Sequence, residues 1–190
     1  MRPWRVEVVN DDYGKESYRI RVYYRGPLSR TRGDPRAIRL DVPRQETLVF
    51  PCRDRAILHS YDDAEKLAHI RVPCYDLREM AVEKLRALTG QRRYAVSRDL
   101  YDVVQLLTLL GGDAPALLSA FPAKWHVKGL SWGAIDLQHL AARRAEFLED
   151  WNNHLLRVLP AIAAPDFDDT WQKACAFVAD LNRRAAGPKP

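Results

Sequence analysis

The sequence has few of the residues that build metal centres or disulfide-rich folds. Its three cysteines, Cys52, Cys74 and Cys175, are odd in number and form no CxxC pair. We therefore expect reduced thiols and a cytoplasmic protein. The five histidines are scattered without the spacing of metal ligands, which argues against a zinc site.

Long apolar runs are also missing. No stretch of about 18 apolar residues occurs, so the sequence predicts no membrane span. The first residues, MRPWRVEVV, lack the apolar core of a signal peptide. What is present is a chain of 190 residues, 47% of them hydrophobic, which is enough to bury the core of one domain or two small ones. The net charge of +5 is mild and is compatible with a polyanionic partner without requiring one.

Up to residue 74 the pattern is typical of strands. SYRIRVYYRG (17–26) and AIRLDVP (37–43) alternate apolar and charged residues, and ETLVFP (46–51) is predicted to be a third strand. AILHSY (56–61) and AHIRVP (68–73) are expected to be short strands or loops. These segments predict a strand-rich part over residues 1–74.

From residue 75 the apolar residues recur at helical spacing. Asp76 suits the N-cap of a first helix, with Glu79 at the capping-box position and Gly90 as its end. The order of elements predicts an α+β fold, in which a small sheet is followed by a helical bundle over residues 75–190. Further helices are predicted from Ser97 to Gly111, from Pro115, over residues 133–158 and after Asp166.

Charged residues lie on the polar faces of both clear strands. Asp41 has Arg39 beside it on one strand, and Arg19 and Arg21 lie on the other. The simplest interpretation is a solvated outer face. If the two strands share a sheet, however, a carboxylate that can hold Mg²⁺ and guanidinium groups that can hold phosphate share one surface, which suits a nucleoside triphosphate.

The first two helices also carry charges at unusual positions. Lys84 lies beside the apolar stripe of its helix, where a lysine either extends to water or is held over a phosphate. Asp99 is favoured at a helix start by the dipole alone. Asp102 lies one turn further, on the same side, where it could pair with Lys84, Arg86 or Arg98, or help to hold a metal-bound substrate.

A basic loop joins these two helices. Arg92, Arg93 and Arg98 flank Tyr94. The loop is either a solvated connection or an anion-binding edge for nucleotide or RNA.

The run YDLREMAVEKLRAL…QRR…SRDLYDVVQLL resembles the signature of the AbiEii/AbiGii nucleotidyltransferase toxin family. Members of that family carry an AEKLxAL-type helix, a short arginine-bearing gap and an RDLYDL motif followed by leucines. SYRIRVYYRGPL and AIRLDV resemble the strands before that helix, and RAEFLEDWNNHLLRVL resembles the C-terminal helices. The resemblance spans nearly the whole chain, and the central motif is its most specific part.

The resemblance implies a nucleotidyltransferase fold in a toxin of a toxin–antitoxin or phage-defence system. It implies transfer of a nucleotide from a nucleoside triphosphate, with Mg²⁺, to an RNA acceptor such as tRNA. By motif position, Asp41 is the strand-borne acid and metal ligand, Lys84 the catalytic or phosphate-binding lysine, and Asp99 or Asp102 the second acid. The expected phosphate-binding side chains are those of Arg19, Arg21, Arg39 and Arg98.

One family feature is missing from this sequence. Family members begin with a Gly-Gly or Gly-Ser turn and a DxD acid pair that holds the metal, and residues 1–37 contain neither. We expect the chain to correspond to the later two-thirds of a family member. Catalysis with one strand-borne acid is unfavourable, so a catalytically incomplete module that binds nucleotide, RNA or an antitoxin is the alternative.

A third possibility is a plain helical interaction protein, and it differs from the enzyme in one geometric prediction. If the chain is an enzyme, Asp41, Lys84 and Asp99 or Asp102 converge on one phosphate-sized site. A plain helical interaction protein would leave them apart. If strands are missing from the start of the sheet, an apolar edge or face is expected to be exposed, which would favour a homo-oligomer or a partner that covers it.

Overall fold

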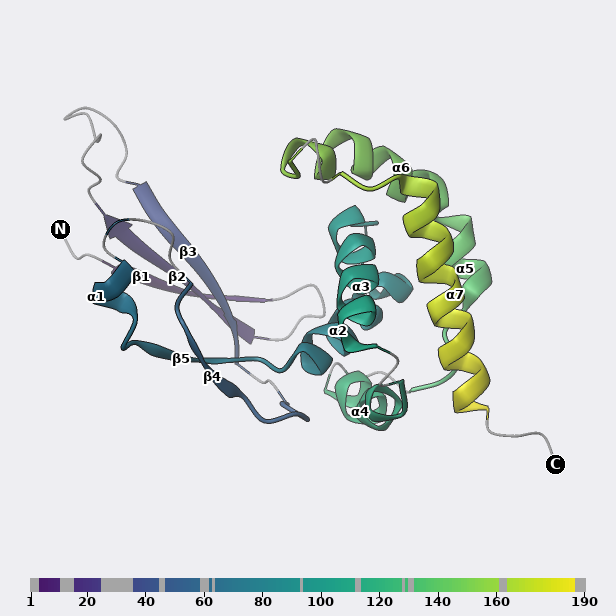
Figure 1. Cartoon of the computed structure of the whole chain (residues 1–190), viewed down its shortest axis with the longest axis horizontal. Coiled ribbons are helices and arrows are strands. Elements are labelled where there is room, and N and C mark those ends of the chain that lie inside the picture. The colour runs from purple at the N-terminus through teal and green to yellow at the C-terminus, as the bar shows by residue number, and fades with distance from the viewer. Residues whose placement is uncertain are drawn as a thin grey trace. The chain divides into compact units, whose positions relative to one another are not determined.

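Alternating apolar and charged residues build the first sheet of the computed structural model (Figure 1). Strands β1 (Trp4–Asn10), β2 (Glu16–Tyr24) and β3 (Arg36–Pro43) pair antiparallel in the order β1-β2-β3. β2 and β3 confirm the two clearest predicted strands, whereas β1 was not predicted. The structure describes residues 4–10, 16–24, 36–44, 47–58, 62, 64–92, 94–111, 114–127, 129, 132–160 and 164–186.

The register of this sheet sorts its side chains onto two faces. Val6, Ile20 and Leu40 are aligned across the three strands, and Glu7, Arg19 and Asp41 form the next row. Because neighbouring residues of a strand point to opposite faces, one face is apolar and the other is charged. The apolar face is open to solvent: its exposed members range from 36% for Tyr18 to 63% for Val8.

A second, two-stranded sheet follows. It pairs β4 (Arg53–Ala56) with β5 (Arg71–Cys74), and the short helix α1 (Ala64–Leu67) lies between them in the sequence. The predicted strand at 46–51 is wrong, since the described residues 47–51 form no strand. The backbone amides of Val49 and Phe50 donate to the carboxylate of Glu79, at 3.1 and 3.0 Å, instead of to a neighbouring strand.

Helices α2 (Leu77–Arg86) and α3 (Ser97–Leu110) follow the predicted pattern closely. Asp76 caps α2 by accepting a hydrogen bond from the Arg78 amide, as predicted. The chain continues through a π-helical turn, Ala87–Gln91, so Gly90 does not end the helix. Gly111, with φ of 59°, ends α3 in the left-handed conformation that glycine adopts without strain.

The remaining helices complete the bundle. α4 spans Ala114–His126, and α7 spans Phe167–Ala185 with Asp166 as its N-cap. The single long helix predicted over 133–158 is wrong, because the chain forms α5 (Leu137–Ala142), α6 (Arg144–Asn153) and a 3-10 turn at Leu155–Arg157. The break falls at Arg143, whose buried guanidinium reaches the Arg92 carbonyl and Glu146. No glycine or proline marks it.

The fold is therefore α+β, as predicted, with its main core among the helices. The contacts divide the chain into two compact units, Met1–Thr47 and Leu48–Pro190. The β4–β5 hairpin is thus grouped with the helices, and the predicted domain boundary between residues 74 and 75 stays a prediction. The three cysteines are free thiols. No helix in the described part of the chain is long and apolar enough to cross a membrane.

Candidate active site on helices α2 and α3

The charged motif residues of α2 and α3 meet in one cluster. The Lys84 Nζ lies 2.8 Å from Asp99 Oδ1 and 2.6 Å from Asp102 Oδ2, so one ammonium bridges two carboxylates. Arg92 adds a second cation, with its Nε 3.0 Å from Asp99 Oδ2. We call Lys84, Arg92, Asp99 and Asp102 the α2–α3 charge cluster. Of the partners that the sequence allowed for Asp102, the structure has Lys84.

Apolar packing fixes this geometry. On α3, Leu100, Val103, Val104 and Leu107 are all buried at the spacing of one helical face. On α2 the corresponding stripe includes the fully buried Leu85, next to Lys84. The packing of the two stripes fixes the backbone on both sides of the cluster. The charged side chains are therefore positioned by this packing and not by their own ion pairs.

The two acids differ in their surroundings. The Asp99 side chain is 1% exposed and contacts both cations, whereas that of Asp102 is 30% exposed and contacts Lys84 alone among the ion pairs of the described residues. Lys84 is 23% exposed. An ammonium carries three N–H donors, and the two carboxylates take two of them. The third is available to a ligand that approaches from solvent.

The start of α3 is held by an acid from α6. Asp150 Oδ2 accepts from the Ser97 amide at 2.7 Å and from the Ser97 hydroxyl at 2.5 Å. Although burial favours the protonated form, these hydrogen bonds hold the pKa of Asp150 below its usual range. The prediction of Ser97 as N-cap is wrong by one residue, because Val96 occupies that position and makes no side-chain hydrogen bond. The Asp150 carboxylate accepts the Ser97 amide hydrogen bond instead.

A second, buried charge cluster lies on the same helix α2. Glu79 is fully buried and pairs with Lys124 of α4, which is 1% exposed. The Lys124 Nζ also lies 2.7 Å from Glu83 Oε1. We call Glu79, Glu83 and Lys124 the buried charge triad. Glu79 was predicted to serve a capping box, but within the described residues its carboxylate contacts Lys124 and the amides of residues 49 and 50.

Sequence reasoning missed the triad and the role of Arg92. Lys124 has a signal that could have been used, because it lies between Phe121 and Trp125 in an otherwise apolar helix. A lysine there needs a carboxylate partner. Arg92 was noted only as part of a basic loop, and Arg93 of that loop lies outside the described residues.

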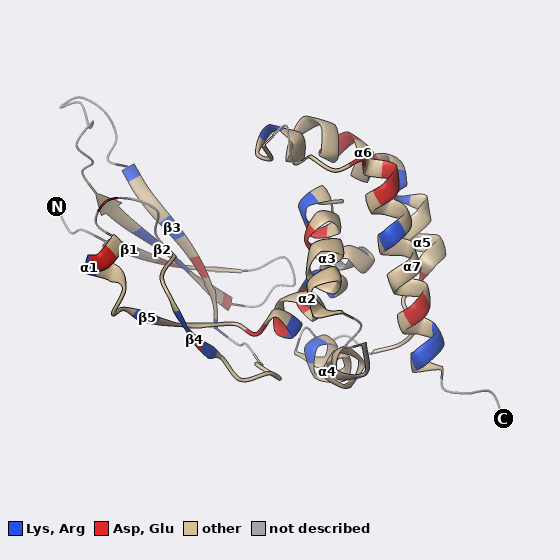
Figure 2. Cartoon of the chain, in the orientation of Figure 1, with Lys and Arg blue, Asp and Glu red and all other residues tan. Residues whose placement is uncertain are grey.

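The other predicted site residues lie mainly in the first unit, Met1–Thr47. Asp41 accepts from Arg19 Nε at 3.0 Å, and Arg39 Nε lies 3.6 Å from its other oxygen. Arg21 is opposite Arg39 in the register, so all four residues share the charged face of the sheet. Figure 2 shows basic residues in blue and acidic residues in red along the strands of this sheet. Arg98, in the first turn of α3, is exposed to solvent.

The described residues supply few of the oxygen ligands that Mg²⁺ prefers. Mg²⁺ is bound by oxygen ligands, including one or two carboxylates. Asp41 supplies one carboxylate, and both of its oxygens face guanidinium groups. Within the described residues, no group of three or more acidic, histidine or cysteine side chains is arranged to hold a metal. These residues alone do not fit the ion.

Comparisons with known proteins agree with the motif. The sequence profile of a family described as "Nucleotidyl transferase AbiEii toxin, Type IV TA system" matches residues 4–173. A search of curated proteins gives no match. Among solved structures, the chain is similar to MenT4, a nucleotidyltransferase toxin from Mycobacterium tuberculosis H37Rv, with 18% identity over 96% of this chain and 67% of that chain, and a TM-score of 0.46. The evidence for the family is the profile.

Proposed function

The chain belongs to the AbiEii nucleotidyltransferase toxin family, and on that premise we propose that it transfers a nucleotide from a nucleoside triphosphate to an RNA acceptor such as tRNA. One observation carries the proposal: the Lys84 ammonium lies 2.8 Å from Asp99 and 2.6 Å from Asp102, at the motif positions of the family. A lysine held in this way, with solvent access, suits binding of a phosphate.

The reaction places negative charge where Lys84 can act. A hydroxyl oxygen of the acceptor attacks the α-phosphorus, a new P–O bond forms, the bond to the pyrophosphate leaving group breaks, and the hydroxyl proton is released to water. Charge accumulates on the phosphoryl and leaving oxygens. A cation that is already in place stabilises this charge without reorganising, which is the main source of catalysis in such transfers. In this proposal Asp99 and Asp102 orient Lys84, and Arg92 keeps Asp99 in place.

The proposed roles of the remaining residues follow from the family motif. Arg19, Arg21 and Arg39 are candidates to bind triphosphate oxygens, and so is Arg98. Asp41 is the family's strand-borne acid and is proposed as its metal ligand. The described residues do not by themselves fit Mg²⁺.

The test of this function is incorporation of a labelled nucleotide into RNA. Each of the four labelled triphosphates is supplied with Mg²⁺ and an RNA acceptor. Lys84→Ala is expected to lower incorporation by about 10²- to 10³-fold, the usual loss when one preorganised electrostatic group is removed. Lys173→Ala removes an exposed lysine of α7 that pairs with Asp169, and serves as the matched control. Equal incorporation by the two variants would contradict the proposal.

A second candidate function is binding without turnover. It is favoured by the pairing of Asp41 with Arg19 and Arg39, which leaves a poor donor set for a metal ion. In this case the chain binds nucleotide, RNA or an antitoxin as a module. Titration calorimetry with triphosphate and Mg²⁺ separates the two functions, because heat of binding without any incorporation supports the second.

The proposed partners follow from the family and from the surface. A toxin of this family implies a cognate antitoxin, a role in phage defence and action in the cytoplasm. The apolar face of the β1–β2–β3 sheet, where Ile38 is 56% and Val8 63% exposed, favours a covering partner or a homo-oligomer. Light scattering over a concentration series tests self-association.

A further inference from the structure

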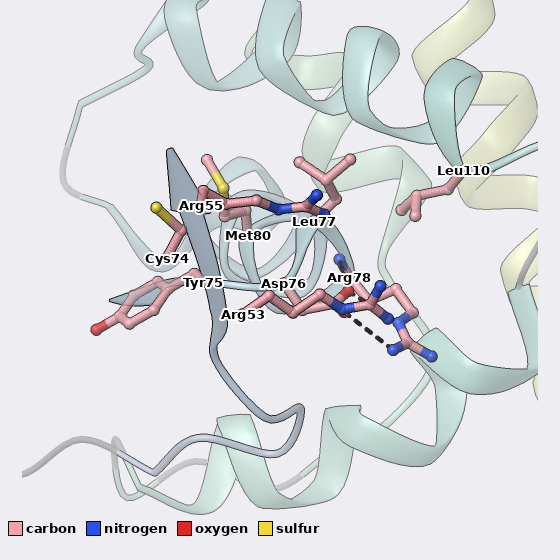
Figure 3. A pocket seen from close by; sticks show the side chains of 9 residues that line it. All are labelled: Arg53, Arg55, Cys74, Tyr75, Asp76, Leu77, Arg78, Met80 and Leu110. Atoms are coloured by element: carbon pink, nitrogen blue, oxygen red, sulfur yellow. Dashed lines mark hydrogen bonds and ion pairs between the residues drawn. The ribbon is translucent and has the colours of Figure 1, made fainter. Parts of the chain in front are cut away.

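A pocket of about 620 Å³ lies between the β4–β5 hairpin and the start of α2. Arg53 and Arg55 reach it from β4, and Tyr75, Leu77, Arg78 and Met80 line it from the start of α2 (Figure 3). We call it the hairpin pocket. None of the candidate catalytic, metal-binding or phosphate-binding residues named above lines it, and the proposed function does not use it.

The pocket has an excess of positive charge. Its one carboxylate, Asp76, is 6% exposed and is held by two guanidinium groups, with Arg53 Nε at 3.0 Å and Arg78 Nε at 2.9 Å. Hydrogen bonds from Arg78 keep the pKa of Asp76 well below its usual range, so the carboxylate stays ionised. Arg55 is exposed and has no ion pair within the described residues. The pocket is therefore lined by three guanidinium groups and a single carboxylate.

Asp76 and a ring fix the orientation of two of these arginines. The Arg78 guanidinium lies 4.5 Å from the centre of the Phe50 ring. It donates hydrogen bonds to both Asp76 carboxylate oxygens, at 2.9 and 3.0 Å. Arg53 pairs with the same carboxylate from the hairpin side. A guanidinium that is already oriented loses less conformational entropy when it binds an anion.

The remaining wall of the pocket is apolar and partly open. Tyr75 is 44%, Leu77 41% and Met80 38% exposed. Flat apolar and aromatic surfaces beside arginines are the features that bind single-stranded nucleic acid, because bases stack on the rings while the cations hold the phosphates.

The position of the pocket relates it to Lys84. Leu77, Met80 and Lys84 are spaced by three and four residues, so they lie on one side of α2. Lys84 lies seven positions after Leu77, a distance of about 10 Å along the helix axis. A strand whose reacting end lies at Lys84 therefore reaches the pocket within a few nucleotides.

We propose that the hairpin pocket holds the acceptor RNA strand next to its reacting end, with phosphates on Arg53 and Arg55 and a base against Tyr75. The proposal rests on the proposed function, since it names where the acceptor of that reaction binds. A peptide of acidic residues alone, such as polyglutamate, would satisfy the arginines as well, but it has no aromatic ring to stack on the exposed Tyr75 ring. The geometry therefore favours RNA.

The experiment measures the affinity of the full chain for a 5′-labelled single-stranded RNA of about ten nucleotides by fluorescence anisotropy. Arg55→Gln is expected to weaken binding about tenfold, as for the loss of a charge-assisted hydrogen bond. It should also reduce the slope of log affinity against log salt by about one. The matched control is Arg71→Gln, which removes the same charge from the opposite face of the same hairpin, as the register shows.

A second pair of variants tests the ring. Tyr75→Ala is expected to weaken binding by at least about fivefold, the lower range for loss of one stacked base. Tyr75→Phe retains the ring and should retain the affinity. Circular dichroism and thermal unfolding of each variant exclude a loss of fold.

Three results would overturn the proposal: equal affinities of Arg55→Gln and Arg71→Gln, an unchanged affinity of Tyr75→Ala, or competition by polyglutamate as strong as that by unlabelled RNA. Failure of the proposed function looks different. If RNA binding depends on Arg55 but the wild-type chain incorporates no nucleotide, the pocket stands as an RNA site and the transfer fails. If Lys84→Ala abolishes incorporation while Arg55→Gln leaves the KM for RNA unchanged, the pocket assignment alone is wrong.

Discussion

Helix α2 contributes to two clusters that have the same chemistry and differ in burial. Lys84 lies between Asp99 and Asp102, and Lys124 lies between Glu79 and Glu83. The Lys84 side chain is 23% exposed and that of Lys124 only 1%. Each ammonium is thus held by two carboxylates, but only one of them can be reached from solvent.

This difference separates a candidate site from a structural support. A buried ion pair is strongly destabilised when one partner is removed, because an uncompensated charge stays in the interior. A partly exposed pair contributes less to stability, and its free N–H can bind a ligand. The buried charge triad also fixes residues 49 and 50 through the Glu79 carboxylate. We therefore propose that Lys124 supports the fold and that Lys84 takes part in the reaction.

The largest expected effect is that of Lys124→Met. It removes the charge while keeping the length of the side chain, and leaves the buried Glu79 side chain without this cation. We expect the free energy of unfolding to fall by about 3–5 kcal/mol, measured by urea denaturation. Lys173→Met, at an exposed pair on α7, should change it by less than about 0.5 kcal/mol. Equal losses at the two positions would remove the distinction between the clusters.

The second prediction separates the two acids of the α2–α3 charge cluster. Asp99→Asn puts an amide between Lys84 and Arg92 at a site that is 1% exposed, so we expect a loss of about 2–3 kcal/mol in unfolding free energy together with a loss of nucleotide transfer. Asp102→Asn, at a site 30% exposed, should lower transfer and change stability by less than about 1 kcal/mol. Urea denaturation and nucleotide incorporation are measured for both variants. A larger loss of stability for Asp102→Asn than for Asp99→Asn would contradict the prediction.

The third prediction concerns Asp150, which anchors the start of α3. Asp150→Asn is expected to lower the unfolding free energy by about 1–2 kcal/mol at neutral pH, as for the loss of an anion at a helix N-terminus. The pKa of Asp150 is lowered in the folded state. Its stabilisation is therefore present above the unfolded pKa of about 3.9 and is lost as the pH falls through the folded value.

The measurement is the difference in stability between wild type and Asp150→Asn as a function of pH. This difference should be largest near neutral pH and shrink in acid below about pH 4. A constant difference over the whole range would show that Asp150 acts through its shape and not through its charge.

The smallest expected effect is in the first unit. Arg19 and Asp41 form an exposed pair, with side chains 34% and 54% exposed. Arg19→Gln should change the unfolding free energy by less than about 0.5 kcal/mol. Any larger change, measured by thermal unfolding, would mean that the charged face of the sheet supports the fold and is less suited to binding a ligand.

The sequence predicted those elements that local pattern determines. Strict alternation gave β2 and β3, and the Asp76 cap, the apolar stripes and Gly111 gave α2 and α3. Long-range contacts decided the elements that were wrong. ETLVFP has strand propensity, but its amides bond to Glu79, and the helix predicted over 133–158 breaks where Arg143 turns towards Arg92. Neither partner can be found from local sequence.

The same distinction holds for the candidate site. Lys84, Asp99 and Asp102 were named from their spacing on two helices and their resemblance to a family motif, and the packing of α2 on α3 brings them within ion-pair distance. The partners of Arg92 and Lys124 depend on how the helices and turns pack together, which the local sequence does not determine. Asp41 belongs to the first unit, Met1–Thr47. Its role as a metal ligand stays a proposal.

The most direct test applies one substitution to both lysines. Lys84→Met and Lys124→Met are assayed for incorporation of labelled nucleotide into RNA, at a temperature where circular dichroism shows both variants folded. We predict that Lys84→Met loses about 10²- to 10³-fold of the activity and loses less stability than Lys124→Met, while Lys124→Met is strongly destabilised and, when folded, retains its activity. Full incorporation by folded Lys84→Met would contradict the assignment of chemistry to this cluster.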